Sequence, residues 1–167
     1  TARKPVGIGV ISLGWMGRLH SRAYATVTKH FPDLEVAPRL VAAADPAPHA
    51  REDALDVLGF ERAYEDYRDL LADPEVDAVS IASPNFLHHE IALAAIEAGK
   101  PFWIEKPMGV NAAQSREIAL AAQKAGLVSA VGFNYRHTPA IEYMRSLVRD
   151  GSLGRITNVR VWFIADY

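Results

Sequence analysis

The fold is decided by the stretch VGIGVISLGWMG at residues 6–17, an apolar run that leads directly into a glycine-containing turn. An uninterrupted apolar run such as 6–11 is typical of a strand that is covered on both faces of a parallel sheet. Gly14 and Gly17 then fill the second and third glycine positions of the G-x-G-x-x-G turn of dinucleotide-binding folds, whereas Ser12 fills the first. A helix that begins near Trp15 would offer unpaired N–H groups and the positive end of its dipole to phosphates.

This turn has two interpretations. Its glycines either allow a pyrophosphate to approach the backbone or only allow a helix to pack closely on a strand. The position of the turn directly after the first buried strand favours the pyrophosphate. The residues that would then wrap it are Ser12, Leu13, Gly14, Trp15, Met16 and Gly17.

Short β-rich runs alternate with longer segments of helical period along the rest of the chain, as in successive βαβ units. The runs that predict strands lie at residues 6–11, 36–44, 60–63, 78–82, 102–104 and 127–133. The segments that predict helices lie at residues 15–30, 48–58, 66–71, 87–98 and 112–125. Asn111 is the expected cap of the last helix, with Gln114 as its capping-box partner. Right-handed crossovers then predict an α/β fold, a doubly wound parallel sheet in the strand order 3-2-1-4-5-6.

The composition of the 167-residue chain excludes several classes of protein. Half of the residues are apolar and 23% are charged, which is a globular balance, and the net charge of −2 gives no basis for binding nucleic acid or an anionic membrane. No apolar run reaches the ~18–20 residues that span a bilayer, and the first residues lack a signal-peptide core. The absence of cysteine excludes disulfides, thiolate zinc sites and cysteine nucleophiles. We expect a cytoplasmic domain that binds neither nucleic acid nor a membrane.

Asp45 ends the second predicted strand and is the candidate for holding the adenosine ribose. A carboxylate at this place accepts hydrogen bonds from both ribose hydroxyls and repels a 2′-phosphate, so it favours NAD over NADP. Arg51 is near enough in sequence to reach a phosphate, so NADP stays open. The alternative interpretation of Asp45 is a helix cap before Pro46.

Ser83-Pro84-Asn85 follows the fourth predicted strand, and His88 lies three residues further on. Ligands of open α/β sheets bind at the carboxyl ends of the strands, which makes these residues binding candidates. Asn85 is equally well suited to cap the next helix. His88 and His89 are adjacent and lack the i, i+4 spacing of a metal-binding pair, so we expect no metal site.

Glu105-Lys106-Pro107 follows the fifth predicted strand. A lysine held at a rigid strand end can bind and polarise a substrate hydroxyl, and partial burial would adjust its pKa for proton transfer. Glu105 is expected to hold the ammonium of Lys106 in place. The alternative is a solvated charge pair without a catalytic role.

The pattern changes after residue 134. Thr138-Pro139 predicts the start of a helix, and the alternation from Arg155 onward predicts a strand with one drier face. Nothing else in the chain is left to pair with that strand. We therefore expect one domain at 1–134 and the beginning of a truncated second domain at 135–167, whose unpaired segment 155–167 would fray or associate with another copy.

At these residues the chain resembles the Gfo/Idh/MocA oxidoreductases, named for glucose–fructose oxidoreductase and inositol dehydrogenase. The resemblance rests on the glycine turn, Ser83-Pro84-Asn85 with His88, Glu105-Lys106-Pro107, and Gly132-Phe133-Asn134-Tyr135-Arg136. Glu-Lys-Pro after the fifth strand is its specific element, whereas the glycine turn is generic. Ser12 departs from the family pattern, because it replaces the first glycine.

The resemblance implies a role for each matching position. The turn 12–17 would wrap the pyrophosphate and Asp45 would hold the adenosine ribose. The residues that would line the nicotinamide side of the cleft are Ser83, Pro84, Asn85 and His88, and Glu105 would bind near the nicotinamide ribose. Lys106 would contact both the substrate hydroxyl and the cofactor, and the bond between Lys106 and Pro107 is a candidate cis peptide.

The resemblance also implies a substrate pocket and a second domain. The residues that would border the pocket are Asn134, Tyr135 and Arg136. The catalytic carboxylate and histidine of the family would lie beyond Tyr167, in a domain whose sheet would make the full-length protein a homo-oligomer.

These features predict an NAD(P)-dependent oxidoreductase that transfers a hydride between nicotinamide and a sugar, a polyol or a related hydroxy compound. Lys106 is the catalytic residue within this chain. Two alternatives stay open. A non-catalytic dinucleotide-binding or regulatory module would not need a lysine after the fifth strand, and an S-adenosylmethionine-dependent transferase shares the glycine turn and the acidic residue after the second strand.

Overall fold

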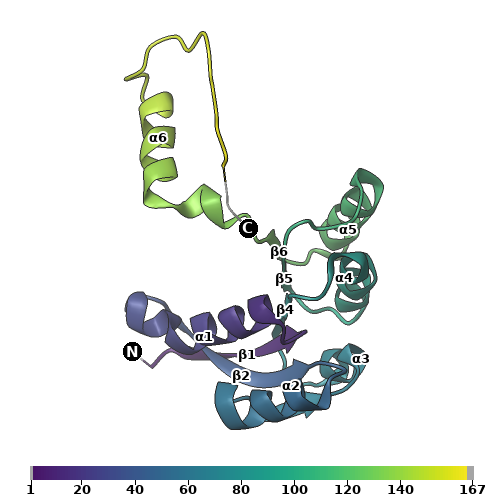
Figure 1. Ribbon diagram of the computed structural model, residues 1–167. Helices are drawn as coiled ribbons and strands as arrows, with labels where there is room; N and C mark the ends of the chain where they lie inside the picture. Colours follow the sequence, from purple (N-terminus) through teal and green to yellow (C-terminus); the bar gives the residue numbers. More distant parts are fainter. Residues whose placement is uncertain (1, 165–167) are drawn as a thin grey trace. The chain divides into compact units, whose positions relative to one another are not determined.

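Six parallel strands form one sheet in the order β3-β2-β1-β4-β5-β6 in the computed structural model, which describes residues 2–164 (Figure 1). The doubly wound order predicted from the sequence is confirmed. The strands are β1 (Lys4–Ile11), β2 (Val36–Ala44), β3 (Arg62–Tyr64), β4 (Ala78–Ile81), β5 (Phe102–Ile104) and β6 (Ser129–Val131). Every neighbouring pair is parallel, so all six carboxyl ends lie at the same edge.

The helices follow the strands as a right-handed doubly wound fold requires. They are α1 (Trp15–His30), α2 (Pro48–Asp53), α3 (Tyr67–Ala72), α4 (His88–Glu97), α5 (Ala112–Ala125) and α6 (Pro139–Arg149). Three further turns of helix are the π-helix η1 (Ala54–Leu58) and the 3₁₀ turns η2 (Asn85–Leu87) and η3 (Asn134–His137).

Two apolar clusters cover the two faces of the sheet. One joins β1, β2, β4 and β5 to α3, α4 and α5 and is centred on Leu70, Ile91 and Ile118, which are fully buried. The other joins β1 and β2 to α2 and η1, with Tyr24 of α1 packed against it. Figure 1 shows α4 and α5 beside each other next to β4, β5 and β6. Burial on both faces is the reason that these strands are continuously apolar rather than alternating.

The structure corrects several predicted element bounds. The helix predicted at 48–58 changes into a π-helix after Asp53. The third strand begins at Arg62 rather than Phe60, because the ladder with β2 starts at Arg62 and the Phe60 N–H donates to the Ala54 carbonyl oxygen at 3.0 Å instead. The sixth strand is three residues long instead of the predicted 127–133, since its one neighbour, β5, offers a ladder of only three residues.

The chain divides into two compact units, Thr1–Gly132 and Phe133–Tyr167. The second unit holds η3, α6 and the segment that follows them. The strand predicted from Arg155 onward is wrong for the described residues, which form no strand after 154. Odd-numbered and even-numbered side chains of this segment are both exposed, for example Val161 and Trp162. No neighbouring strand among the described residues pairs with the segment. Residues 165–167 of the predicted strand lie outside the described residues.

Candidate functional site

The carboxyl edge of the sheet brings the predicted site residues into one row. Ile11 of β1 pairs in register with Ala44 of β2 and with Ile81 of β4, and the register continues through β5 to β6. The backbone ladder extends past four of the strands, β1, β4, β5 and β6: the N–H groups of Ser12, Ala82, Glu105 and Gly132 donate to carbonyl oxygens of the neighbouring strands at 2.8–3.0 Å. The glycine turn, Asp45 and Glu105 therefore all leave the sheet at the same level.

The turn after β1 contains the one non-glycine residue in the left-handed region among the described residues. Ser12 has φ 71°, a conformation that costs an L-residue about 1–2 kcal/mol. This is the first position of the fingerprint, where the family has glycine. The backbone conformation therefore follows the glycine pattern although the side chain does not.

The two glycines of the turn have different environments. A Cβ atom on Gly17 would lie 1.9 Å from the carbonyl oxygen of Ser12, so Gly17 is required for the close packing of α1 on the turn. A Cβ atom on Gly14 would meet nothing within 4 Å, and the φ of Gly14 is −61°, which any residue adopts. Neither packing nor conformation within the chain requires a glycine at position 14. Gly14 is the N-cap of α1 and has no side chain to cap the first N–H groups of this 16-residue helix.

Asp45 ties the loop after β2 to the glycine turn. Its Oδ2 accepts a hydrogen bond from the Leu13 N–H at 2.8 Å, and its Oδ1 accepts one from the Ala47 N–H at 2.9 Å. The carboxylate is largely buried. The N-cap of α2 is Ala47, so the alternative of Asp45 as the cap residue of that helix is wrong.

Arg51 is already engaged by its own loop. Its Nη1 donates to the carbonyl oxygens of Asp45 at 2.9 Å and Pro46 at 2.8 Å, and its Nη2 lies 3.5 Å from Glu65. The guanidinium thus closes the loop that carries Asp45.

The loop after β4 carries one buried polar atom without a partner. Ser83 Oγ has no hydrogen-bond partner among the described residues, although the residue is buried, at only 7% exposed. Pro84 and Asn85 are exposed at the start of η2. The N-cap of α4 is Leu87, so Asn85 does not cap this helix.

His88 is fully buried, which differs from the expected contact with nicotinamide. Its Nδ1 lies 2.7 Å from the carbonyl oxygen of Pro107, and its Nε2 lies 2.9 Å from that of Ser83. The ring therefore joins the loop after β4 to the loop after β5. It faces backbone carbonyls rather than open space, so it holds the loops that carry candidate site residues.

Lys106 is exposed, and its bond to Pro107 is cis, as the resemblance implied. The expected ion pair between Lys106 and Glu105 is wrong for this structure, since none of the salt bridges between described residues joins them. Glu105 is buried, and its Oε1 lies 3.1 Å from Nε2 of His20. The Lys106 N–H contacts Glu105 Oε2 at 3.3 Å. The carboxylate thus faces inward and leaves the Lys106 ammonium free.

Three residues of this region were not predicted from the sequence. His20 and Tyr24 face the sheet from α1, and Ser80 of β4 lies between them. Burial raises the pKa of the Tyr24 phenol. The available signal was spacing: His20 follows the buried Gly17 by three residues, which places both on the same side of a helix.

Asn134, Tyr135 and Arg136 are exposed and lie in η3, within the second unit. Tyr135 packs edge-on against Phe163, with ring centroids 6.0 Å apart. Their place beside a substrate pocket stays a prediction.

Two searches of the described residues give negative results. Between residues 2 and 164, no helix combines the length and the apolar character needed to cross a bilayer. In the same part of the chain, no three His, Asp or Glu side chains gather where they could hold a metal ion.

The sequence pattern of the oxidoreductase family with an NAD-binding Rossmann fold matches residues 6–133. The chain belongs to this family, the Gfo/Idh/MocA oxidoreductases. The match includes the glycine turn, Asp45, Ser83 and Glu105-Lys106-Pro107, so the family assignment and the row of residues at the sheet edge agree.

The curated relatives include dehydrogenases named for a sugar derivative and for inositols. The chain is 36% identical over 162 residues to levoglucosan dehydrogenase of Pseudarthrobacter phenanthrenivorans, covering 97% of this chain and 42% of that protein. It is 33% identical over 150 residues to inositol 2-dehydrogenase/D-chiro-inositol 3-dehydrogenase of Lactiplantibacillus plantarum, covering 89% of this chain and 41% of that protein. The chain thus spans about two fifths of the length of the curated relatives it matches.

Solved structures of the family have the same fold. An NAD-binding oxidoreductase from Klebsiella pneumoniae superimposes with a TM-score of 0.85 at 43% identity, covering 92% of this chain and 40% of that one. Levoglucosan dehydrogenase in complex with NADH gives a TM-score of 0.87 at 36% identity. The match covers 91% of this chain and 41% of that one. The chain is therefore similar over most of its length to a protein that binds NADH.

Proposed function

We propose that this chain supplies the cofactor-binding part and one catalytic lysine of an NAD-dependent dehydrogenase that acts on the CH–OH group of a sugar or polyol. The observation that carries the proposal is the single edge that holds the glycine turn after β1, Asp45 after β2 and Lys106 after β5. The names of the relatives, levoglucosan and inositol dehydrogenases, support the substrate class.

The residues present fit a dinucleotide. The open space at Gly14, in front of the uncapped first turn of α1, suits a pyrophosphate, because free N–H groups and the helix dipole favour an anion there. The unpartnered Ser83 Oγ, in the loop after the neighbouring strand β4, suits a polar group of the nicotinamide half. With Pro84 and Asn85 it would line that half, as Glu105 would near the ribose.

Asp45 and Arg51 together favour NAD over NADP. The Asp45 carboxylate keeps lone pairs for the ribose hydroxyls besides its two backbone hydrogen bonds, and it repels a 2′-phosphate. The Arg51 guanidinium is already bonded to two carbonyl oxygens, so a 2′-phosphate would have to compete with them.

Lys106 is the residue that touches the substrate. The nicotinamide, when bound, accepts or donates the hydride at the carbon that bears the substrate hydroxyl. The exposed Lys106 ammonium would donate a hydrogen bond to that hydroxyl oxygen and stabilise negative charge on it as its proton leaves. Asn134, Tyr135 and Arg136 would border the pocket, and the full-length protein would supply a carboxylate and a histidine.

Two further expectations belong to this proposal. We infer that the full-length protein is a cytoplasmic homo-oligomer; the resemblance implies a second domain whose open sheet is suited to a subunit interface. Analytical ultracentrifugation of the full-length protein tests its oligomeric state.

Calorimetric titration of the chain with NADH, NADPH and S-adenosylhomocysteine tests the cofactor. We expect NADH to bind more tightly than NADPH and S-adenosylhomocysteine not to bind. Turnover of inositols and anhydrosugars by the full-length protein, with and without Lys106→Ala, tests the catalytic part. Turnover that survives Lys106→Ala would contradict the role of Lys106, whereas NADH binding without any turnover would favour a regulatory module.

A further inference from the structure

The carboxylate of Glu105 is held by a histidine from a distant part of the chain. Nε2 of His20, on α1, lies 3.1 Å from Glu105 Oε1, and Nδ1 of the same ring lies 2.7 Å from Ser80 Oγ on β4. Both side chains of the His20–Glu105 pair are largely buried, at 14% and 11% exposed. The pair is therefore shielded from solvent, where a hydrogen bond to a carboxylate is at its strongest.

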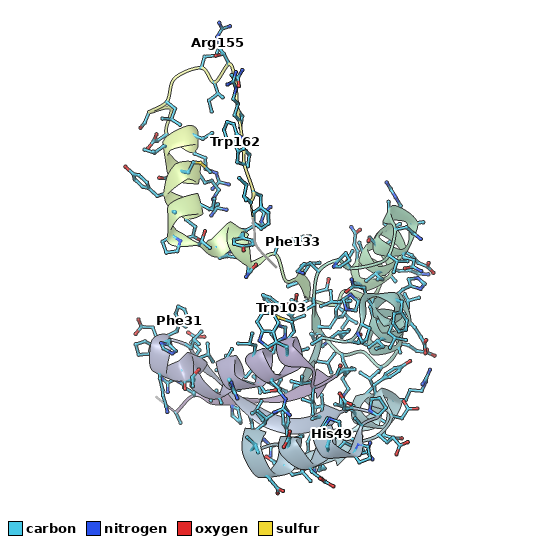
Figure 2. The ribbon with its side chains drawn as sticks, viewed as in Figure 1. Phe31, His49, Trp103, Phe133, Arg155 and Trp162 are labelled. Carbon is cyan, nitrogen blue, oxygen red and sulfur yellow. The ribbon has the colours of Figure 1, made fainter. Side chains whose placement is uncertain are left out.

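The surroundings leave this carboxylate little freedom. A Cβ atom on Gly132 would lie 2.8 Å from Glu105 Oε1, so the absence of a side chain at position 132 makes room for the carboxylate. The Trp103 ring stands edge-on to His20, with centroids 6.1 Å apart and planes at 84°, and Figure 2 shows Trp103 next to α1. Glu105 is thus fixed by a hydrogen bond on one side and by packing on the other.

The hydrogen-bond partners determine which nitrogen of the ring carries the proton. An ionised carboxylate only accepts, so Nε2 of His20 must be the donor to Glu105. Nδ1 is then free to accept from the Ser80 hydroxyl. The donors then run in one direction, from the Ser80 hydroxyl through His20 to Glu105.

We propose that His20 is a positioning residue that turns the Glu105 carboxylate inward and thereby sets the nicotinamide end of the cleft. This inference rests on the proposed function, in which Glu105 lies near the nicotinamide ribose and Lys106 beside the reacting carbon. With Glu105 Oε1 bound to His20, the remaining lone pairs of the carboxylate are presented in one orientation, and the Lys106 N–H contacts Oε2 at 3.3 Å. The Lys106 ammonium is left without an ion-pair partner among the described residues.

A matched pair of variants tests the hydrogen bond. His20→Gln keeps an amide donor near the position of Nε2, whereas His20→Asn keeps a donor only near Nδ1. Each variant is titrated with NADH and with ADP-ribose, which lacks the nicotinamide. We expect His20→Asn to weaken NADH binding about tenfold and ADP-ribose binding less than twofold, and His20→Gln to recover most of the loss.

The control is His89→Asn. His89 also pairs with a glutamate, at 2.9 Å from Glu117, but this pair is less buried, at 24% and 60% exposed. We expect it to change neither affinity. If His20→Asn weakened the binding of NADH and of ADP-ribose equally, the role of His20 would be merely structural and the proposal would be overturned. Equal NADH affinities of the Asn and Gln variants would overturn it as well.

Nitrogen NMR of the wild-type chain supplies a second measurement that does not depend on a variant that folds. We expect a proton on Nε2 of His20, and a proton on Nδ1 alone would overturn the assignment. Failure of the proposed function gives a different result, namely a wild-type chain that binds neither NADH nor ADP-ribose while the ring keeps its Nε2 proton.

Discussion

The carbonyl oxygen of Ser12 lies so close to Gly17 that a Cβ atom at position 17 would stand 1.9 Å from it. The same addition at Gly14 meets nothing within 4 Å. The two glycines of this motif therefore have different structural roles. Gly17 lets α1 pack on the turn, and Gly14 leaves space in front of the helix.

This difference predicts that alanine at position 17 mainly lowers stability, whereas alanine at position 14 mainly weakens NADH binding. Gly17→Ala should lower the free energy of unfolding by about 3 kcal/mol, because backbone must move to admit the methyl group. Gly14→Ala should lower it by about 1 kcal/mol or less but weaken NADH binding at least tenfold. Urea unfolding and NADH titration measure the two effects, and unchanged NADH affinity in Gly14→Ala would contradict a pyrophosphate at this place.

Ser12→Gly should stabilise the chain. The left-handed conformation of Ser12 costs an L-residue about 1–2 kcal/mol, whereas a glycine costs about 0.5–1 kcal/mol through the freedom it gains in the unfolded chain. We expect the free energy of unfolding to rise by about 0.5–1 kcal/mol. Ser12→Val is the matched opposite and should lower it; a stabilising valine would show that position 12 is not strained.

Asp45→Asn should reduce the preference for NADH over NADPH. The substitution removes the charge that repels a 2′-phosphate and replaces one acceptor oxygen of the carboxylate by a donor. We expect NADH affinity to fall about tenfold and the ratio of the two affinities to move toward one. Asp66→Asn is the control, since Asp66 also accepts from a backbone N–H, that of Arg68 at 2.8 Å, but at the start of α3. It should leave the ratio unchanged.

His88→Leu should destabilise the chain strongly. The ring is fully buried between the carbonyl oxygens of Ser83 and Pro107, and replacing it removes the ring N–H that donates to this pair. We expect a loss of about 2 kcal/mol in urea unfolding, because an unsatisfied buried acceptor costs about 1–3 kcal/mol. His89→Leu, at the neighbouring half-buried site, should cost less, because the His89 ring contacts the exposed Glu117 rather than buried carbonyl oxygens; equal losses would refute the bridging role.

Acid should weaken the fold in part through Glu75. Hydrogen bonds from Arg39 and Arg62 lower the pKa of Glu75 in the folded chain below its usual value. These pairs therefore stabilise the fold at neutral pH, and the stabilisation is lost as the pH falls from the usual glutamate pKa through the lowered one. Unfolding measured from pH 7 to pH 3 should show a smaller pH dependence in Arg39→Gln than in the wild type. An unchanged dependence would exclude this contribution.

Local chemistry made many elements predictable. Asn111 accepts from the Gln114 N–H at 2.9 Å, as a helix cap should, and α5 ends at Gly126, whose φ of 67° suits glycine. The capping box is shifted, however, because Gln114 Oε1 accepts from the Val110 N–H rather than from that of Asn111. Strand lengths were less predictable, since a strand extends only as far as its neighbour pairs with it.

The sequence by itself determined the parallel sheet, its strand order and the residues that reach its carboxyl edge. Continuous apolar runs require burial on both faces of the sheet. Right-handed crossovers then restrict the sheet to one strand order. Only the tertiary structure decided where the polar atoms of those residues point. Glu105 bonds to His20 instead of Lys106, and His88 joins two loops instead of facing the cleft. Such contacts join residues 5 to 85 positions apart, and a local sequence pattern carries no information on which distant donor will lie opposite a buried acceptor.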